Sequence, residues 1–153
     1  MTMADMSRTR LRAWLTAGIW SIAAAGLVGS FFLGSGPEGF AADSLRHLTA
    51  AGAVAFGFFG YWLVLWVTRR RKGAPPAEDE RDLLVTSRAN QTALVVVLVW
   101  VFAVAIGLWV AYEAAGQVPA GWLWFLAYGS VVVATVTSAV GTLVWDGRLG
   151  GRG

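Results

Sequence analysis

Four apolar runs that contain no charged residue dominate the sequence. They cover residues 14–33, 48–68, 89–112 and 122–145, and each is 20 to 24 residues long. At about 1.5 Å per residue, a helix of about 20 residues crosses the roughly 30 Å hydrocarbon core of a bilayer. Backbone polar groups in lipid must be satisfied within the spanning segment, which favours a helix for each run. The sequence therefore predicts an all-α integral membrane protein with four transmembrane helices.

Turn-forming and capping residues predict where these helices begin and end. Glycine and proline in residues 34–39 and 116–119 suit short connections, so the helices should pair as two antiparallel hairpins in a four-helix bundle. Asp43 or Ser44 can cap the second helix by accepting its free backbone N–H groups. The expected helices cover about 13–33, 46–68, 77–115 and 119–146, with a cytoplasmic turn over 69–76. The third would be about 58 Å long and would project beyond the bilayer.

Basic residues are placed very unevenly around the apolar runs. Eleven of the twelve lysines and arginines flank the termini or the central polar segment, and Arg46 alone lies at the other helix ends. Basic residues near helix ends stay on the cytoplasmic side, so both termini should be cytoplasmic in an inner membrane. The strongest topology anchors are Arg69, Arg70, Arg71 and Lys72. Membrane topology explains the net charge of +3, so the expected partner is the lipid bilayer and not nucleic acid.

Small side chains recur at helical spacing on the first and fourth helices. Because small residues let helix backbones approach closely in lipid, these ridges predict helix packing faces. On the first helix the ridge is Ala17, Ser21, Ala25 and Gly29, and on the fourth it is Ser130, Ala134 and Ser138. The alternative is a general enrichment of small residues in membrane helices. Asn90 and the hydroxyl residues could hydrogen-bond between helices or line a polar path, and packing is the favoured interpretation.

The residues that usually carry membrane chemistry are missing from the runs. The chain has no cysteine, its single histidine is His47 near the outer end of the second helix, and no run contains a carboxylate or a histidine. Proton-coupled transport and helical haem binding generally need such groups inside the membrane. We therefore expect no catalytic residues, no cofactor and no metal, and we expect that the protein is not an enzyme.

The central polar segment is the one place where the sequence suggests a contact beyond the bilayer. Its candidate partner-binding or lipid-binding residues are Glu78, Asp79, Glu80, Arg81, Asp82 and Arg88. Arg81 and Arg88 lie seven residues apart on one helix face, where they could hold lipid phosphates or acids of a partner. The alternative is an ordinary helix start, with acids that suit the helix dipole and surface ion pairs of Arg81 or Arg88 with Glu78 or Asp82.

The same segment carries a resemblance to a family. Residues 79–82, Asp-Glu-Arg-Asp, followed by Ser-Arg-Ala-Asn-Gln at 87–91, resemble small bacterial and archaeal predicted membrane proteins of unknown function, which have an Asp-Glu-Arg signature after a basic turn. The tract at 118–128 is similar to one in uncharacterised relatives. The resemblance covers about residues 60–147 and implies no activity, and at most a loose association with transcriptional regulators.

Three functions remain open at the level of sequence. The first is a non-enzymatic membrane protein that acts by helix association, as a homo-oligomer or as an accessory subunit of a membrane complex. The second is a small oligomeric channel or transporter, for which the hydroxyl residues of the fourth helix are the motive. The third is a membrane sensor, in which the long third helix passes a change in packing to a soluble regulator.

Overall fold

The computed structural model describes residues 8–33, 36–40, 42–68 and 80–150, and all of its elements are helices. The helices are α1 (Arg8–Phe32), α2 (Gly36–Phe40), α3 (Ser44–Val67), α4 (Glu80–Tyr112) and α5 (Ala120–Gly150). Every helix except the five-residue α2 is long and apolar enough to cross a membrane. This composition is that of a multi-pass membrane protein. The four topology anchors at 69–72 and the expected start of the third helix at residue 77 lie outside the described residues.

The long helices extend further at the two chain ends than the apolar runs predict. α1 begins at Arg8, more than one turn before residue 13, and α5 continues to Gly150, beyond its expected end at residue 146. At 25 residues, α1 is about 38 Å long, so its first turn lies beyond a hydrocarbon core of roughly 30 Å. The terminal turns of α1 and α5 can be helical without apolar side chains, because these turns lie in water and not in lipid.

Local capping explains the other helix ends. The Asp43 carboxylate accepts hydrogen bonds from the backbone N–H groups of Leu45 and Arg46, at 3.0 and 3.2 Å, and so caps α3 as expected. α4 ends at Tyr112 and not at residue 115. Gly116 follows it with φ of +68° and donates its N–H to the Tyr112 carbonyl at 3.1 Å. A left-handed glycine after the last turn is the common way to terminate a helix.

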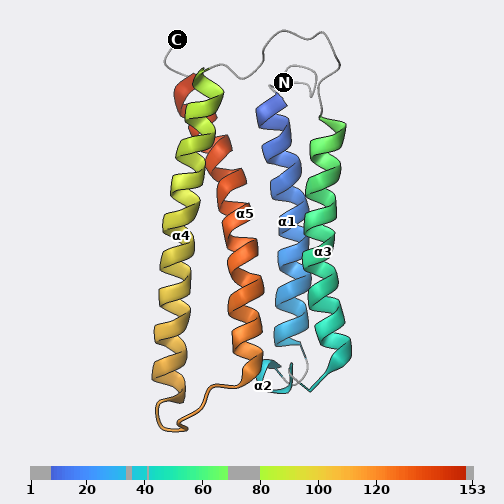
Figure 1. Ribbon diagram of the computed structural model, residues 1–153, viewed down its shortest axis with the longest axis vertical. Coiled ribbons are helices and arrows are strands. Elements are labelled where there is room, and N and C mark those ends of the chain that lie inside the picture. The colour runs from blue at the N-terminus through green and yellow to red at the C-terminus, as the bar shows by residue number, and fades with distance from the viewer. Residues whose placement is uncertain (1–7, 34–35, 41, 69–79, 151–153) are drawn as a thin grey trace.

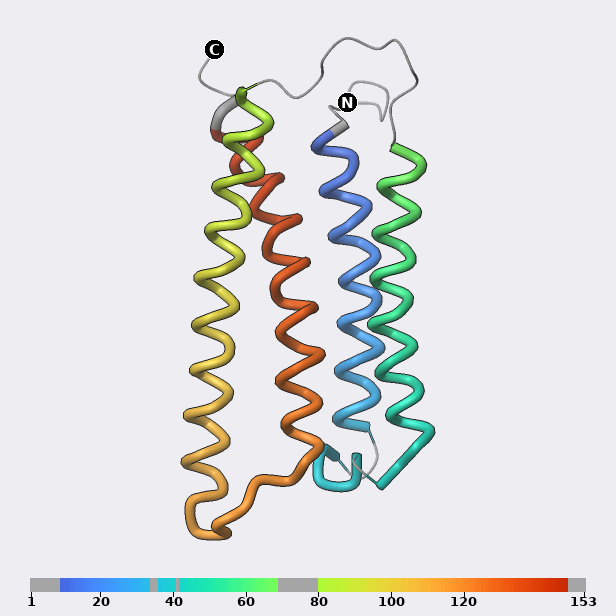
Figure 2. Tube along the Cα trace, in the orientation of Figure 1, coloured from blue at the N-terminus to red at the C-terminus, as the bar shows by residue number. Residues whose placement is uncertain are grey.

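The helices run alternately down and up, and they lie in the order α4, α5, α1, α3 across the molecule (Figure 1). The extensive interfaces are α1 with α3, α4 with α5, and α1 with α5. The tube in Figure 2 shows the same two antiparallel hairpins, α1–α3 and α4–α5, side by side. α3 and α4 follow each other in sequence but lie at opposite edges. The arrangement is therefore an open row, in which α5 and α1 join the hairpins.

The core lies along one stripe of α1. Trp20, Ala23, Leu27 and Phe31 recur at helical spacing and are all essentially inaccessible to solvent. At the end of the molecule that contains α2, Phe31 stacks on Phe40 with ring centroids 3.9 Å apart, and the edge of Phe125 packs against Phe31 at 5.2 Å. These rings fill the space between α1, α2 and α5. α2 is thus a short helix inside the connection that was expected to be only a turn.

His47 lies beside this aromatic cluster. Its ring is 4.3 Å from the ring of Phe40 and 5.5 Å from the ring of Trp124, measured between centroids. The sequence places His47 near the outer end of the second helix, and the structure half-buries it there between aromatic side chains. Among the described residues, no three histidine, aspartate or glutamate side chains gather closely enough to hold a metal ion.

Candidate functional site: a polar cavity between the hairpins

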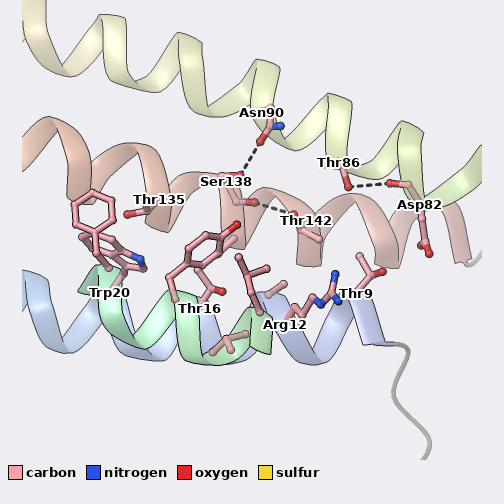
Figure 3. Close-up of a pocket in the computed structure, with 16 residues that line it drawn as sticks. Thr9, Arg12, Thr16, Trp20, Asp82, Thr86, Asn90, Thr135, Ser138 and Thr142 are labelled. Atoms are coloured by element: carbon pink, nitrogen blue, oxygen red, sulfur yellow. Dashed lines mark hydrogen bonds between the residues drawn. The ribbon is translucent and has the colours of Figure 1, made fainter. Parts of the chain in front are cut away.

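A cavity of ≈ 400 Å³ lies between the two hairpins, toward the end of the molecule where α1 begins and α5 ends. All four long helices line it, and we call it the polar cavity. Figure 3 shows its labelled polar side chains converging from α1, α4 and α5. The polar lining residues are Thr9, Arg12, Thr16, Tyr61, Asp82, Thr86, Asn90, Thr135, Ser138 and Thr142.

The cavity reaches well into the membrane-spanning part of the helices. Arg12 and Asp82 lie at its mouth, whereas Trp20 and Asn90 follow them by eight residues on α1 and α4. Eight residues of helix correspond to about 12 Å along the axis. A hydrocarbon core is roughly 30 Å thick, so polar groups line the space to a substantial fraction of that depth. Such groups are costly in lipid unless they face protein or water, which the cavity provides.

Arg12 forms one side of the mouth and ties α1 to α3. Its Nε donates a hydrogen bond to Thr68 Oγ1 at 2.6 Å, and its Nη2 donates to the Thr68 carbonyl oxygen at 3.0 Å. Thr68 directly follows α3, so the guanidinium lies at a helix C-terminus, where the dipole favours positive charge. These bonds fix Arg12 on the α1–α3 hairpin and leave three of its five N–H donors for other contacts.

Asp82 forms the opposite side of the mouth, on the α4–α5 hairpin. It lies in the first turn of α4, where the dipole favours negative charge, and its side chain is half-buried. Its backbone carbonyl accepts a hydrogen bond from Thr86 Oγ1 at 2.9 Å. Within the described part of the chain, the Asp82 carboxylate itself forms neither a salt bridge nor a hydrogen bond. The carboxylate is therefore available to a solute in the cavity.

Hydroxyl and amide groups line the walls below the mouth. Ser138 Oγ donates to Asn90 Oδ1 at 2.8 Å and so links α5 to α4. The hydroxyls of Thr135 and Thr142 instead donate to carbonyls of their own helix, at 2.8 and 2.9 Å. Of these side chains, only Ser138 and Asn90 make the hydrogen bond between helices that the sequence suggested. Hydroxyls bonded to backbone carbonyls keep lone pairs free to accept a hydrogen bond.

Trp20 forms the floor of the cavity. A Cβ built on Gly57 of α3 would lie 2.8–2.9 Å from Trp20 Cζ3, Cε3 and Cη2, so that edge of the indole packs directly on the glycine. Phe58 packs edge-on against the indole, with centroids 5.3 Å apart. The opposite edge carries Nε1, which has no hydrogen-bond partner among the described residues. In Figure 3 the indole nitrogen lies on the side of the ring that faces the rest of the cavity.

The candidate partner-binding residues at the start of α4 do not share one exposed surface. Arg81 Nη2 donates to both the carbonyl oxygen and Oδ1 of Asp146 in α5, each at 3.0 Å. Arg88 lies over the ring of Trp145 at 5.8 Å. Both arginines thus contact α5, whereas Glu80 is exposed and Asp82 lines the cavity. The remaining two candidates, residues 78 and 79, lie outside the described residues.

The small ridge expected on the first helix does not coincide with the buried stripe of α1. Ser21 and Ala25 are exposed, and Ala17 and Gly29 are half-buried. The buried stripe contains Trp20 because α3 presents Gly57 to it, so the small residue of that contact is on the partner helix. On α5, Ser130, Ala134 and Ser138 are all half-buried.

Sequence reasoning did not identify the polar cavity, although the signal for it exists. Polar residues recur at helical spacing on three helices: Thr9, Arg12 and Thr16 on α1, Asp82, Thr86 and Asn90 on α4, and Thr135, Ser138 and Thr142 on α5. Each set alone is compatible with an ordinary helix end. Their common register toward the same end of the molecule is the feature that points to one shared polar space.

Comparison with known proteins yields no match for this chain. No protein-family model matches it, and neither a curated protein nor a solved structure shows significant similarity. The resemblance of residues 79–91 and 118–128 to a family of small membrane proteins therefore stays a prediction.

Proposed function

We propose that the protein is a non-enzymatic, multi-pass protein of the cytoplasmic membrane that acts by helix association, most simply as a homo-oligomer. The supporting observation is a second hollow, of ≈ 640 Å³, between α1, α4 and α5. We call it the apolar groove. Its lining includes the small residues Ser21 and Ala24 of α1 and Ala103 of α4, with valines of α4 and α5 between them.

The packing of α4 supports a partner helix in this groove. The buried residues of α4 are Val85, Ala89 and Ala93, all in its first half. The part of α4 beyond Ala93, more than half of its 33 residues, contains no fully buried residue. Ser21 and Ala25 on α1 are likewise exposed. Helix association in lipid depends on close backbone approach at small residues, and the groove presents such residues on both borders. A helix of a second copy would cover them.

Disulfide crosslinking in native membranes tests this association. The chain has no cysteine, so single substitutions can be read without background. We expect Ser21→Cys, Ala24→Cys or Ala103→Cys to give a crosslinked dimer on mild oxidation, because these positions line the apolar groove. Leu63→Cys is the matched control, since Leu63 is exposed on α3 at the far edge of the row.

Two results would contradict homo-oligomerisation through this groove. One is the absence of a dimer at all three groove positions together with a monomeric mass in mild detergent. The other is equal crosslinking at Leu63, which would indicate random collision. If the groove variants crosslink to a different protein of the membrane, the accessory-subunit form of the proposal replaces the homo-oligomer.

We also propose that both termini face the cytoplasm. The described ends of α1 and α5 lie at the same end of the molecule, with Arg12, Arg81 and Arg148, whereas Arg46 lies near α2. A protease-cleavable tag placed after Gly153 should therefore be protected in sealed spheroplasts and cleaved after lysis. Cleavage of the tag in intact spheroplasts, with a cytoplasmic marker protein still protected, would refute this orientation.

The channel and sensor alternatives receive less support. The polar cavity ends on Trp20, and the rings of Phe31, Phe40 and Phe125 pack beyond it, which suits a closed binding space better than an open pore. A sensor turn at Arg81 and Arg88 would need these side chains free for a partner, and both already contact α5.

A further inference from the structure

The mouth of the polar cavity places opposite charges on different hairpins. Arg12 belongs to the α1–α3 hairpin and Asp82 to the α4–α5 hairpin, and both line the cavity. They form no ion pair with one another, and the two described salt bridges of the protein join other residues. The Arg12 guanidinium lies at the C-terminus of α3 and Asp82 at the N-terminus of α4, and each terminus favours the charge it meets. Among the described residues, Arg12 has three further N–H donors and Asp82 has its carboxylate oxygens to offer a ligand.

The interior below the mouth is amphipathic. Thr16, Asn90 and Thr142 offer hydrogen bonds on the walls, whereas Phe58 and the buried Trp20 make the deep end aromatic. The indole Nε1–H of Trp20 is buried without a described partner and needs an acceptor. The volume of ≈ 400 Å³ falls within the range of about 300–1,000 Å³ that is typical of small-molecule sites.

From this arrangement we propose that the polar cavity binds a small amphipathic zwitterion of about the size of an amino acid. Its anionic group contacts the Arg12 guanidinium, its ammonium group contacts the Asp82 carboxylate, and its apolar body points toward Phe58 and Trp20. The inference concerns a ligand and does not depend on the oligomeric state proposed above.

The two charges also account for selection against related molecules. A singly charged cation is attracted by Asp82 but repelled by the positive charge of Arg12. A singly charged anion is attracted by Arg12 but repelled by Asp82. Discrimination arises as much from such unfavourable contacts as from favourable ones. A zwitterion alone pairs both walls, and it does so in a partly desolvated space where charge interactions are stronger than in water.

Calorimetric titration of the full-length protein in nanodiscs tests the proposal with three matched compounds. L-phenylalanine is the zwitterion, 2-phenylethylamine is its cationic counterpart and 3-phenylpropionate is its anionic counterpart. We expect phenylalanine to bind at least about tenfold more tightly than either of the others, a difference of 1.4 kcal/mol. Equal binding of all three, tighter binding of a singly charged compound or no binding of phenylalanine would overturn the proposal.

Variants at the mouth locate the site. Asp82→Asn removes the carboxylate, so phenylalanine should lose about tenfold in affinity and should then bind no better than 3-phenylpropionate. Glu80→Gln is the matched control, since Glu80 carries the same charge in the same turn of α4 but is exposed and does not line the cavity. Unchanged phenylalanine affinity in Asp82→Asn, or an equal loss in Glu80→Gln, would refute the assignment.

A second variant keeps the test decisive if Asp82→Asn does not fold. Thr142→Leu places a larger apolar side chain in the cavity without changing any charge, and it removes only a hydrogen bond within α5. It should abolish phenylalanine binding while the protein keeps its helical circular dichroism and its elution volume. Retained binding in Thr142→Leu would place the ligand elsewhere and would contradict the proposal.

Discussion

Replacing Gly121 with alanine is expected to destabilise the end of the molecule that contains α2. A Cβ at Gly121 would collide with the carbonyl oxygen of Pro37 in α2, and it would lie 3.2 Å from Phe40 Cβ. The obstacle is backbone, so it cannot be relieved by a change of rotamer. α2 would have to move, and Phe40 with it, which disrupts the stacking of Phe40 on Phe31.

The expected size follows from the cost of overpacking. Added methyl groups in a tightly packed region typically cost about 1–3 kcal/mol, and here the contact is with backbone, so we expect the upper part of that range. For a chain of this length, each kcal/mol lowers the unfolding midpoint by about 2–4 °C. Thermal unfolding in detergent, followed by circular dichroism, measures the change.

Gly147→Ala is the matched control on the same helix. A Cβ at Gly147 meets nothing within 4 Å, and alanine favours helix over glycine by up to about 1 kcal/mol. The control should therefore be neutral or slightly stabilising. A Gly121→Ala protein as stable as the control would show that α2 does not pack against the start of α5 as described.

The second large effect is expected at Gly57, where α3 meets α1. An alanine Cβ there would lie 2.8–2.9 Å from three ring atoms of Trp20, which is 1% exposed and therefore has little room to move. We expect Gly57→Ala to separate α3 from α1 locally and to cost about 1–3 kcal/mol. Because Trp20 is also the floor of the polar cavity, phenylalanine binding should weaken in the same variant.

Gly52→Ala provides the control within α3. A Cβ at Gly52 meets nothing within 4 Å, so this change should leave ligand binding unaltered and, as at Gly147, should be neutral or slightly stabilising. If the unfolding midpoint fell in both variants, the loss of stability would come from replacing any glycine of α3 and not from the contact with Trp20. Unchanged stability of Gly57→Ala would contradict the close packing of Trp20 on this glycine.

The spanning helices could be predicted because their signal is local and large. A run of about 20 residues without a charge has few structural solutions in a bilayer, and the cap at Asp43 and the stop at Gly116 are equally local. α2 was missed because Gly36 and Pro37 favour turns, and what holds Phe40 in place is a contact with Phe31 from another helix.

The polar cavity was missed for a related reason. The side chains of Arg12 and Asp82 look like ordinary helix-end charges when each helix is considered alone, and only the packing of α1 on α5 brings them to one space. The small ridge of α1 was assigned to packing from its spacing alone. Which face of α1 packs against a neighbouring helix depends on the residues of that neighbour. On α3 the neighbour presents Gly57, so the Trp20 face of α1 packs there and the small ridge does not.

The hydrogen bonds near the cavity mouth have a mechanical consequence. Arg12 with Thr68 links α1 to α3, whereas Arg81 with Asp146 and Asn90 with Ser138 link α4 to α5. Each hairpin is thereby held together by its own hydrogen bonds, and the two hairpins meet along α1 and α5. The gap between Arg12 and Asp82 therefore lies between two hairpins that are each held together by their own hydrogen bonds. A solute that spans the gap would bridge the two hairpins and would strengthen their attachment at this end of the molecule.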